Sequence, residues 1–219
     1  MTTLVSSRSP AGLGEANRSG RKRRAILDAA TDVFLKSGYL GANMDEIAAL
    51  ASVSKQTVYK QFASKETLFI EIVTGMTSEA GDRVLNEMPV PNENADLAEY
   101  LRHYAEKQLT VVLTPRLMRL RRLVIGEVSR FPELAKVLYE SGPMRAMTAL
   151  ATTFERLTER GLLAIDDPLV AASHFNWLIM SDPLNRAMLL GDEAIPTRAE
   201  LRRHAAEGVR VFLAAYGKQ

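Results

Sequence analysis

Residues 55–61 bring together amide, hydroxyl, phenol and ammonium groups within two turns of a helix. Amide and hydroxyl groups can form hydrogen bonds with base edges in the major groove of DNA, and ammonium groups can pair with its phosphates. The side chains that could act in this way are Lys55, Gln56, Thr57, Tyr59, Lys60 and Gln61. The same residue types also occur on helices that only face solvent, so the neighbouring segments decide between the two interpretations.

The residues around this polar set predict a helix that would hold it in place. Val58 and Phe62 are four residues apart, so both fall on one face of a helix, where they could pack against a core. Ser54 precedes the helix, and its hydroxyl can accept a hydrogen bond from an unpaired backbone N–H of the first turn. The polar side chains would then cover the outward face.

The preceding sequence predicts two more helices. Small and apolar residues recur at helical spacing in the first of them, at Ala25, Ile26, Ala29, Ala30, Val33 and Phe34. Gly38 is placed to end this helix in a left-handed conformation. Asn43 and Glu46 have the spacing of a capping box, which would open a short helix over 44–51. A long helix, a short helix, a tight turn and a polar helix therefore follow one another.

This arrangement resembles the N-terminal DNA-binding domain of the TetR/AcrR family of bacterial transcriptional regulators, above all in the segment IAALASVSKQTVYKQFASKETLF (residues 47–69). Many members have glycine where this chain has Ser52 and Gln56, and threonine where it has Asn43. Gln56 adds a side chain that can bind bases, which predicts an operator particular to this protein. Residues 121–147 and 166–175 resemble the C-terminal domain of the AefR-like subset of these regulators.

The resemblance implies an all-α fold, and we expect three parts: a flexible arm over 1–20, a three-helix helix-turn-helix DNA-binding domain over 21–66, and a helical ligand-binding and dimerisation domain over 67–219. Proline and N-cap signals predict helices over about 95–112, 115–130, 132–139, 144–160, 168–190 and 198–215. The resemblance further implies that residues 167–190 and 197–215 pair with their copies in a second chain.

Charge is distributed unevenly along the chain. Residues 1–65 hold 10 of the 28 Lys and Arg and 5 of the 26 Asp and Glu, so this part carries a charge of +5 although the whole chain carries only +2. The densest cluster, Arg21–Arg24, lies at the start of the first helix, where cations oppose the helix dipole. Attraction to phosphates explains the cluster better than helix stability does, although a solvated basic tail remains the alternative.

The residues predicted to contact DNA follow from these observations and from the resemblance. They are Arg21, Lys22, Arg23, Arg24, Asn43, Ser54, Lys55, Gln56, Thr57, Tyr59, Lys60 and Lys65. The expected partner is double-stranded DNA.

Nothing in the sequence predicts an enzyme. The chain has no cysteine, its three histidines are far apart, and it contains neither a phosphate-binding loop nor a dinucleotide fingerprint. We therefore expect no catalytic residue, no metal site and no cofactor. The absence of a signal-like or membrane-spanning apolar run predicts a soluble, cytoplasmic protein.

The resemblance also implies a small-molecule pocket within the C-terminal domain. Apolar side chains with a few polar groups would form it, and the candidates are His103, Tyr104, Met118, Arg122, Phe131, Met147, Phe154, His174 and Trp177. Most residues of this kind belong to a core, so only some of them are expected to touch a ligand. An arginine run over 119–122 could select an anion, although such a run more often faces solvent.

The resulting hypothesis is a ligand-responsive transcriptional repressor that binds a palindromic operator as a homodimer. A transcriptional activator, or a DNA binder that needs no effector, is the first alternative. A helical small-molecule-binding protein or enzyme with a vestigial DNA-binding domain is the second.

Overall fold

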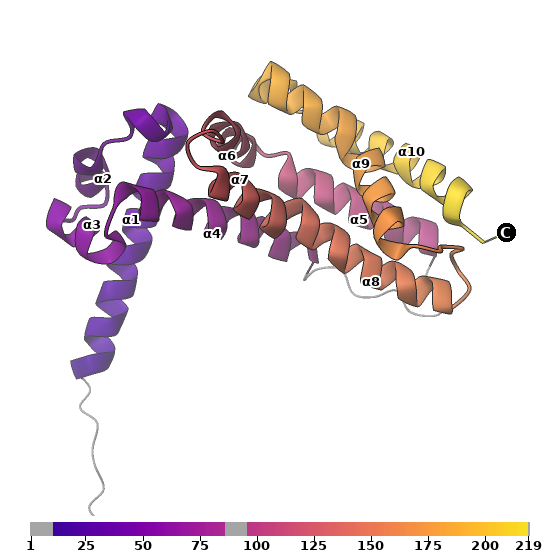
Figure 1. Ribbon diagram of the computed structural model, residues 1–219, viewed down its shortest axis with the longest axis horizontal. Coiled ribbons are helices and arrows are strands. Elements are labelled where there is room, and N and C mark those ends of the chain that lie inside the picture. Colours follow the sequence, from indigo (N-terminus) through magenta and orange to yellow (C-terminus); the bar gives the residue numbers. More distant parts are fainter. Residues whose placement is uncertain (1–10, 86–95, 219) are drawn as a thin grey trace, which may run out of the picture. The chain divides into compact units, whose positions relative to one another are not determined.

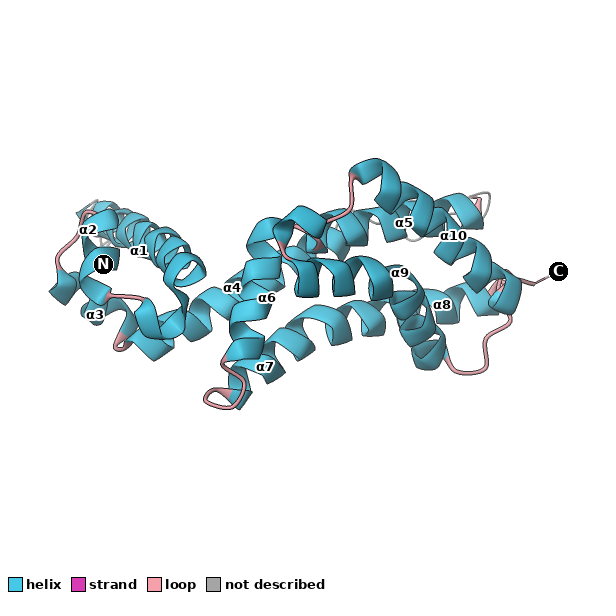
Figure 2. Cartoon of the chain, turned by 90° about the horizontal axis from the view of Figure 1, so that it is seen from above, coloured by secondary structure: helices cyan, strands magenta, loops and turns pink. Residues whose placement is uncertain are grey.

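The computed structural model describes residues 11–85 and 96–218, and these form an all-α protein, as predicted. Throughout the described part every regular element is a helix, apart from one isolated bridge between Leu163 and Gly217 (Figure 2). The chain divides into two compact units, Met1–Ile72 and Val73–Gln219, which we call the head and the body.

The head consists of α1 (Ala11–Gly41), α2 (Met44–Leu50), α3 (Lys55–Phe62) and the first turns of α4 (Lys65–Leu85) (Figure 1). Rings from α1 and α4 meet in its core: the centroids of Phe34 and Phe69 are 4.9 Å apart, and those of Tyr39 and Phe69 are 5.2 Å apart. Val58 and Phe62 of α3 are buried, as the spacing predicted. The three predicted helices are therefore all present.

The flexible arm predicted for residues 1–20 needs correction. α1 already begins at Ala11, so residues 11–20 are helical, while residues 1–10 lie outside the described part. A turn added to an existing helix gains one hydrogen bond per residue and needs no new nucleus. The buried face that begins at Ile26 can therefore support a helix that extends well before it. Gly38 adopts φ 71° at the predicted helix end, but one further turn continues to Gly41.

The body contains the end of α4 and a series of further helices, most of them with side-chain N-caps. They are α5 (Leu97–Val112), α6 (Pro115–Gly126), α7 (Pro132–Tyr139), η1 (Glu140–Met144), α8 (Arg145–Glu159), α9 (Pro168–Leu190), η2 (Asp192–Ala194) and α10 (Arg198–Tyr216). Asp96, Thr114, Asp167 and Thr197 accept backbone N–H groups at the starts of α5, α6, α9 and α10. The last three of these helices begin at the residues predicted from the sequence.

Two predicted helix ends in the body were wrong. α6 stops at Gly126 rather than near Arg130, because the chain passes into turns before Phe131. The Gly142–Pro143 break does not occur: a π-helical turn, η1, contains Pro143 and joins α7 to α8. A turn of this width can accommodate a proline, which has no N–H to donate to a regular α-helical ladder.

The body core forms where α5, α8, α9 and α10 pack together (Figure 1). Its centre is a group of aromatic rings: the centroid of Phe175 lies 5.9 Å from Tyr104, 6.0 Å from Phe154 and 5.1 Å from Phe212. All four side chains are nearly or completely buried. This cluster fixes the helices that carry the candidate site.

α9 and α10 are also joined by one polar contact at a proline. Pro183 lies inside α9 and cannot donate a hydrogen bond to the carbonyl of Ile179, four residues earlier. Nε2 of His204 in α10 lies 2.8 Å from that carbonyl oxygen. Since a carbonyl only accepts, the imidazole must donate here, and it replaces the N–H that Pro183 lacks.

Candidate DNA interface and ligand cavity

The exposed face of α3 carries the polar residues that the sequence singled out. The Ser54 hydroxyl accepts the backbone N–H of Thr57 at 3.2 Å and so caps the helix. Lys55, Gln56 and Lys60 are exposed, and 42% of Tyr59 is exposed. With the opposite face buried, α3 presents amide, hydroxyl and ammonium groups outward, which is the chemistry needed to contact bases and phosphates.

Ser54→Ala is expected to lower the free energy of unfolding of the head by about 1 kcal/mol, because the N-terminal amides of α3 lose their capping oxygen. Urea denaturation followed by circular dichroism measures this change. Ser37→Ala, at an exposed position of α1, serves as a control and should change stability by less than about 0.5 kcal/mol. Equal stability of the two variants would contradict a capping role for Ser54.

Besides Ser54 and Thr57, whose hydroxyls lie 2.8 Å apart, four of the predicted DNA contacts are engaged within the head itself. Arg23 pairs with Glu71, and its guanidinium lies 4.9 Å from the centroid of the Phe62 ring. Lys65 lies 4.9 Å from the centroid of the Tyr39 ring and donates to a backbone carbonyl at 3.2 Å. These interactions fix the middle of α1 and the start of α4 to the rest of the head. They give both cations a structural role whether or not they also reach phosphates.

The other two engaged residues belong to the helix-turn-helix. The Asn43 side chain accepts the N–H of Asp45 at 2.8 Å and caps α2. The ammonium of Lys55 lies 3.0 Å from the Asp45 carboxylate, and this hydrogen bond raises the pKa of Lys55. The role of Asp45 was not predicted, because nothing in a spacing of ten residues signals a contact between α2 and α3. By contrast, Arg21, Lys22 and Arg24 are exposed side chains on α1.

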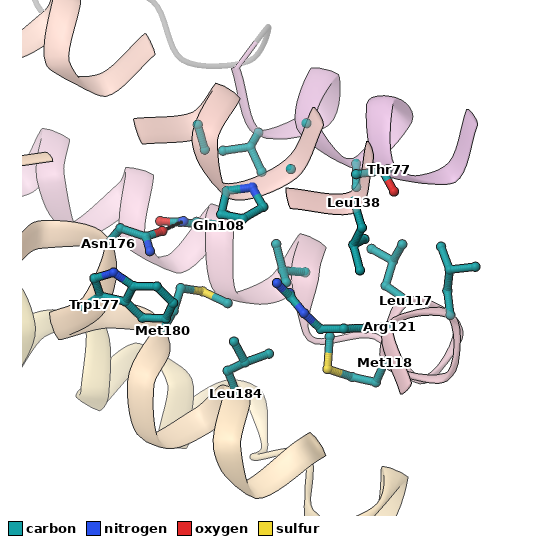
Figure 3. Close-up of a pocket in the computed structure, with 18 residues that line it drawn as sticks. Thr77, Gln108, Leu117, Met118, Arg121, Leu138, Asn176, Trp177, Met180 and Leu184 are labelled. Carbon is teal, nitrogen blue, oxygen red and sulfur yellow. Dashed lines mark hydrogen bonds between the residues drawn. The ribbon is translucent and has the colours of Figure 1, made fainter. Parts of the chain in front are cut away.

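A cavity with about 760 Å³ of empty space, including its opening to solvent, lies within the body (Figure 3). Residues of α4, α5, α6, α7, α8, α9 and η1 surround it, and nearly all of its lining is apolar. The polar side chains of the lining are Thr77, Gln108, Arg121 and Asn176. A largely apolar cavity with a few polar side chains is typical of small-molecule sites.

Only two of the nine residues predicted to form a pocket line this cavity, Met118 and Trp177. The other seven are placed elsewhere in the body. Tyr104, Met147 and Phe154 are core residues, Phe131 is buried before α7, His103 is exposed, and His174 lies 2.6 Å from the Tyr216 hydroxyl. Arg122 donates to Asp192 and to the carbonyl of Ala187. Helical periodicity identified buried faces, but it could not show which of them border an unfilled space.

The arginines of α6 differ in their surroundings. Arg119 and Arg122 both donate to the carboxylate of Asp192, at 2.7 and 2.5 Å. These hydrogen bonds, that of Arg122 first, lower the pKa of Asp192. Arg121 instead lines the cavity, and burial lowers the pKa of its guanidinium.

Two buried amides form the polar end of the cavity. Nε2 of Gln108 donates to Oδ1 of Asn176 at 2.8 Å, and each residue is at most 5% exposed. Within the described structure, Oε1 of Gln108 has no hydrogen-bond partner. Sequence analysis missed this pair, since the two residues are 68 positions apart on separate helices.

Several large apolar side chains of α9 and α10 are exposed in the single chain. The six are Leu169, Val170, Trp177, Leu189, Leu190 and Val211. The resemblance implied that residues 167–190 and 197–215 pair with a second chain, and the structure leaves these apolar side chains uncovered. A face of this kind is typical of a surface that contacts another chain.

Residues 11–85 and 96–218 contain no group of three or more His, Asp or Glu that could hold a metal ion. No helix within the same ranges is long and apolar enough to cross a membrane.

Both units match known protein families. Residues 26–72 match the family described as bacterial regulatory proteins, tetR family, and residues 99–218 match the AefR-like transcriptional repressor, C-terminal domain. A crystal structure of a TetR-family transcriptional regulator from Mesorhizobium loti MAFF303099 is 41% identical, with a TM-score of 0.85 over 91% of this chain and 98% of that one.

Two other similar proteins extend the comparison. The Flavonoid-responsive Regulator FrrA is 32% identical, with a TM-score of 0.73 over 90% of this chain and 98% of its own. The HTH-type transcriptional regulator YhgD of Bacillus subtilis strain 168 is 27% identical over 184 residues, which cover 78% of this chain and 91% of that protein.

Proposed function

This chain belongs to the TetR family of DNA-binding transcriptional regulators, and we propose that it is a ligand-responsive repressor that binds a palindromic operator as a homodimer. The observation that carries the proposal is the combination of an outward polar α3 in the head with a polar-ended cavity in the body. A regulator of this kind acts on chromosomal DNA, so we assign it to the cytoplasm.

We assign the DNA contacts by chemistry. Arg21, Lys22 and Arg24 of α1, with Tyr59 and Lys60 of α3, are exposed groups that can reach phosphates, and they would position the head on the duplex. Gln56 and Thr57 lie in the first turn of α3, and we assign them to base edges. Arg23, Asn43, Ser54, Lys55 and Lys65 support this surface through the contacts described above.

Dimerisation is supported by the uncovered apolar face of α9 and α10. A symmetric pairing of these helices would remove the face from water, and it would give one assembly two copies of α3. Two recognition helices spaced one DNA turn apart, roughly 34 Å, match a palindromic site. The same face therefore accounts for both the dimer and the form of the operator.

Response to a ligand is supported by the cavity and by a similar protein whose name describes it as flavonoid-responsive. A ligand changes DNA binding only if it binds one conformation of the dimer more tightly than the other. An effector-independent DNA binder would be favoured by a closed apolar core, and the cavity argues against it. The match of residues 99–218 to a repressor domain favours repression over activation.

The experiment that tests the function is selection of fragments from a genomic pool by the purified protein at near-physiological salt, followed by sequencing. Enrichment of a palindromic site is the expected result. Salt-sensitive retention of fragments without a shared motif would contradict specific operator recognition.

Gln56→Ala is expected to change which operator variants the protein prefers, because an amide that can pair with a base edge is lost. Each base pair read by Gln56 should lose about 1–3 kcal/mol of discrimination, which is measured by titrating single-base operator variants. Gln61→Ala is the matched control, since the Gln61 amide donates to Ser19 within the head at 3.2 Å. Unchanged preference in Gln56→Ala would remove this residue from base recognition.

A further inference from the structure

We propose that the body cavity binds an amphipathic organic acid, an apolar ring system whose carboxylate pairs with Arg121 and whose hydroxyl or N–H group donates to Gln108. This inference rests on the proposed ligand-responsive function, and it adds the chemical class of the ligand. Three features of the cavity carry it: a cation and a buried acceptor that have no partner among the described residues, and apolar walls between them (Figure 3).

Arg121 is the only charged side chain among the residues that line the cavity. No hydrogen bond or ion pair joins it to any described residue, whereas its neighbours Arg119 and Arg122 share the Asp192 carboxylate. Arg121 is also partly buried, so its charge has lost hydration without gaining a counter-ion. A ligand carboxylate would supply the missing charge, and the planar guanidinium can bind it through two parallel hydrogen bonds.

Gln108 provides the second polar contact for the ligand. Its amide nitrogen donates to Oδ1 of Asn176, which holds the side chain in place, and its buried Oε1 has no donor within residues 11–85 and 96–218. A buried acceptor that lacks a partner destabilises the empty state relative to a state in which a ligand donates to it. The site therefore selects a ligand with an O–H or N–H group at a distance from its carboxylate.

The cavity walls between Arg121 and Gln108 favour a ligand with an apolar framework. Figure 3 shows Arg121 extending between a side that carries Met180 and Trp177 and a side that carries Leu117 and Leu138. Trp177 offers a flat aromatic surface, and methionine side chains adjust to ligands of different outline. A ring system with one anionic and one hydrogen-bonding end meets all three features of the cavity.

The test uses calorimetric titration of the full chain at pH 7 with 6-hydroxy-2-naphthoate, its carboxamide 6-hydroxy-2-naphthamide, and 2-naphthoate. Wild-type protein should bind the hydroxynaphthoate at least tenfold more tightly than the carboxamide and more tightly than 2-naphthoate. Arg121→Met should abolish the preference for acid over amide, while Arg121→Lys should retain part of it. Arg116→Met, at an exposed position of the same helix, should retain all of it.

Gln108→Leu separates the second contact from the first. This variant should bind hydroxynaphthoate and 2-naphthoate equally, yet it should still prefer acid to amide. Circular dichroism of every variant establishes that it is folded. Equal binding of acid and amide by wild-type protein, persistence of the preference in folded Arg121→Met, or no binding of any of the three probes would each overturn the proposal.

These outcomes are separate from those of the operator selection. An enriched operator together with equal binding of acid and amide would leave the proposed function standing and reject the ligand class. If the protein prefers the acid to the amide but no operator is enriched, the ligand class stands and the proposed function is rejected.

Discussion

Phe175→Ala is expected to lower the free energy of unfolding of the body by about 3–5 kcal/mol, because it removes a completely buried ring from the centre of the core. Phe175 contacts the rings of Tyr104, Phe154 and Phe212, so the cavity left behind would border three large side chains and three helices besides its own. Rigid neighbours of this kind cannot collapse fully into the space. Urea denaturation of the full chain, followed by far-ultraviolet circular dichroism, measures the change.

Tyr139→Ala is the matched control for this substitution. Tyr139 is 52% exposed at the end of α7, so its removal should change stability by about 1 kcal/mol or less. Phe175→Leu keeps most of the apolar volume and should be destabilised less than the alanine variant. A loss below about 1 kcal/mol in Phe175→Ala would mean that this ring is not central to the core.

The double substitution Tyr59→Ala with Lys60→Ala is expected to weaken binding to every DNA sequence by about 100-fold and to flatten the salt dependence. Both side chains are exposed on α3, so the head should remain folded. A dimer would lose two ammonium groups, and the slope of log K against log salt should fall by about 2. Binding to operator and to unrelated duplexes, measured at several salt concentrations, gives both quantities.

Lys136→Ala controls for the change in net charge, since Lys136 is an exposed lysine of the body that lies 3.8 Å from Glu140. It should leave the salt slope unchanged. If the double variant keeps the wild-type slope, Lys60 does not contact a phosphate.

The helix boundaries of the body were largely predictable because they depend on local chemistry. A capping side chain followed by proline acts over three or four residues, and the starts at Thr114 and Asp167 lie where these signals stand. The exceptions also have local causes. Proline usually ends a helix, but Pro143 lies inside a π-helical turn that joins α7 to α8.

The identity of contacts between distant segments could not be predicted in the same way. Arg23 was recognised as one of a basic cluster, but its pairing with Glu71 depends on how α1 and α4 pack. Similarly, Tyr104 and Phe154 were predicted to line a pocket, because the sequence does not distinguish a filled core from an open cavity. Gln108 and Asn176 carry no local signal at all, because each is an ordinary polar residue until the fold brings them together.

The contact between Pro183 and His204 has a consequence for how sequences of this kind can diverge. The carbonyl of Ile179 needs one donor, which comes from a histidine because the residue four positions later is a proline. If another residue replaced the proline, its own N–H would restore the regular ladder and the histidine would be free to change. If the histidine changed first, a buried carbonyl would lose its donor. Substitution of Pro183 is therefore expected to precede substitution of His204, because only the first substitution supplies another donor for the carbonyl.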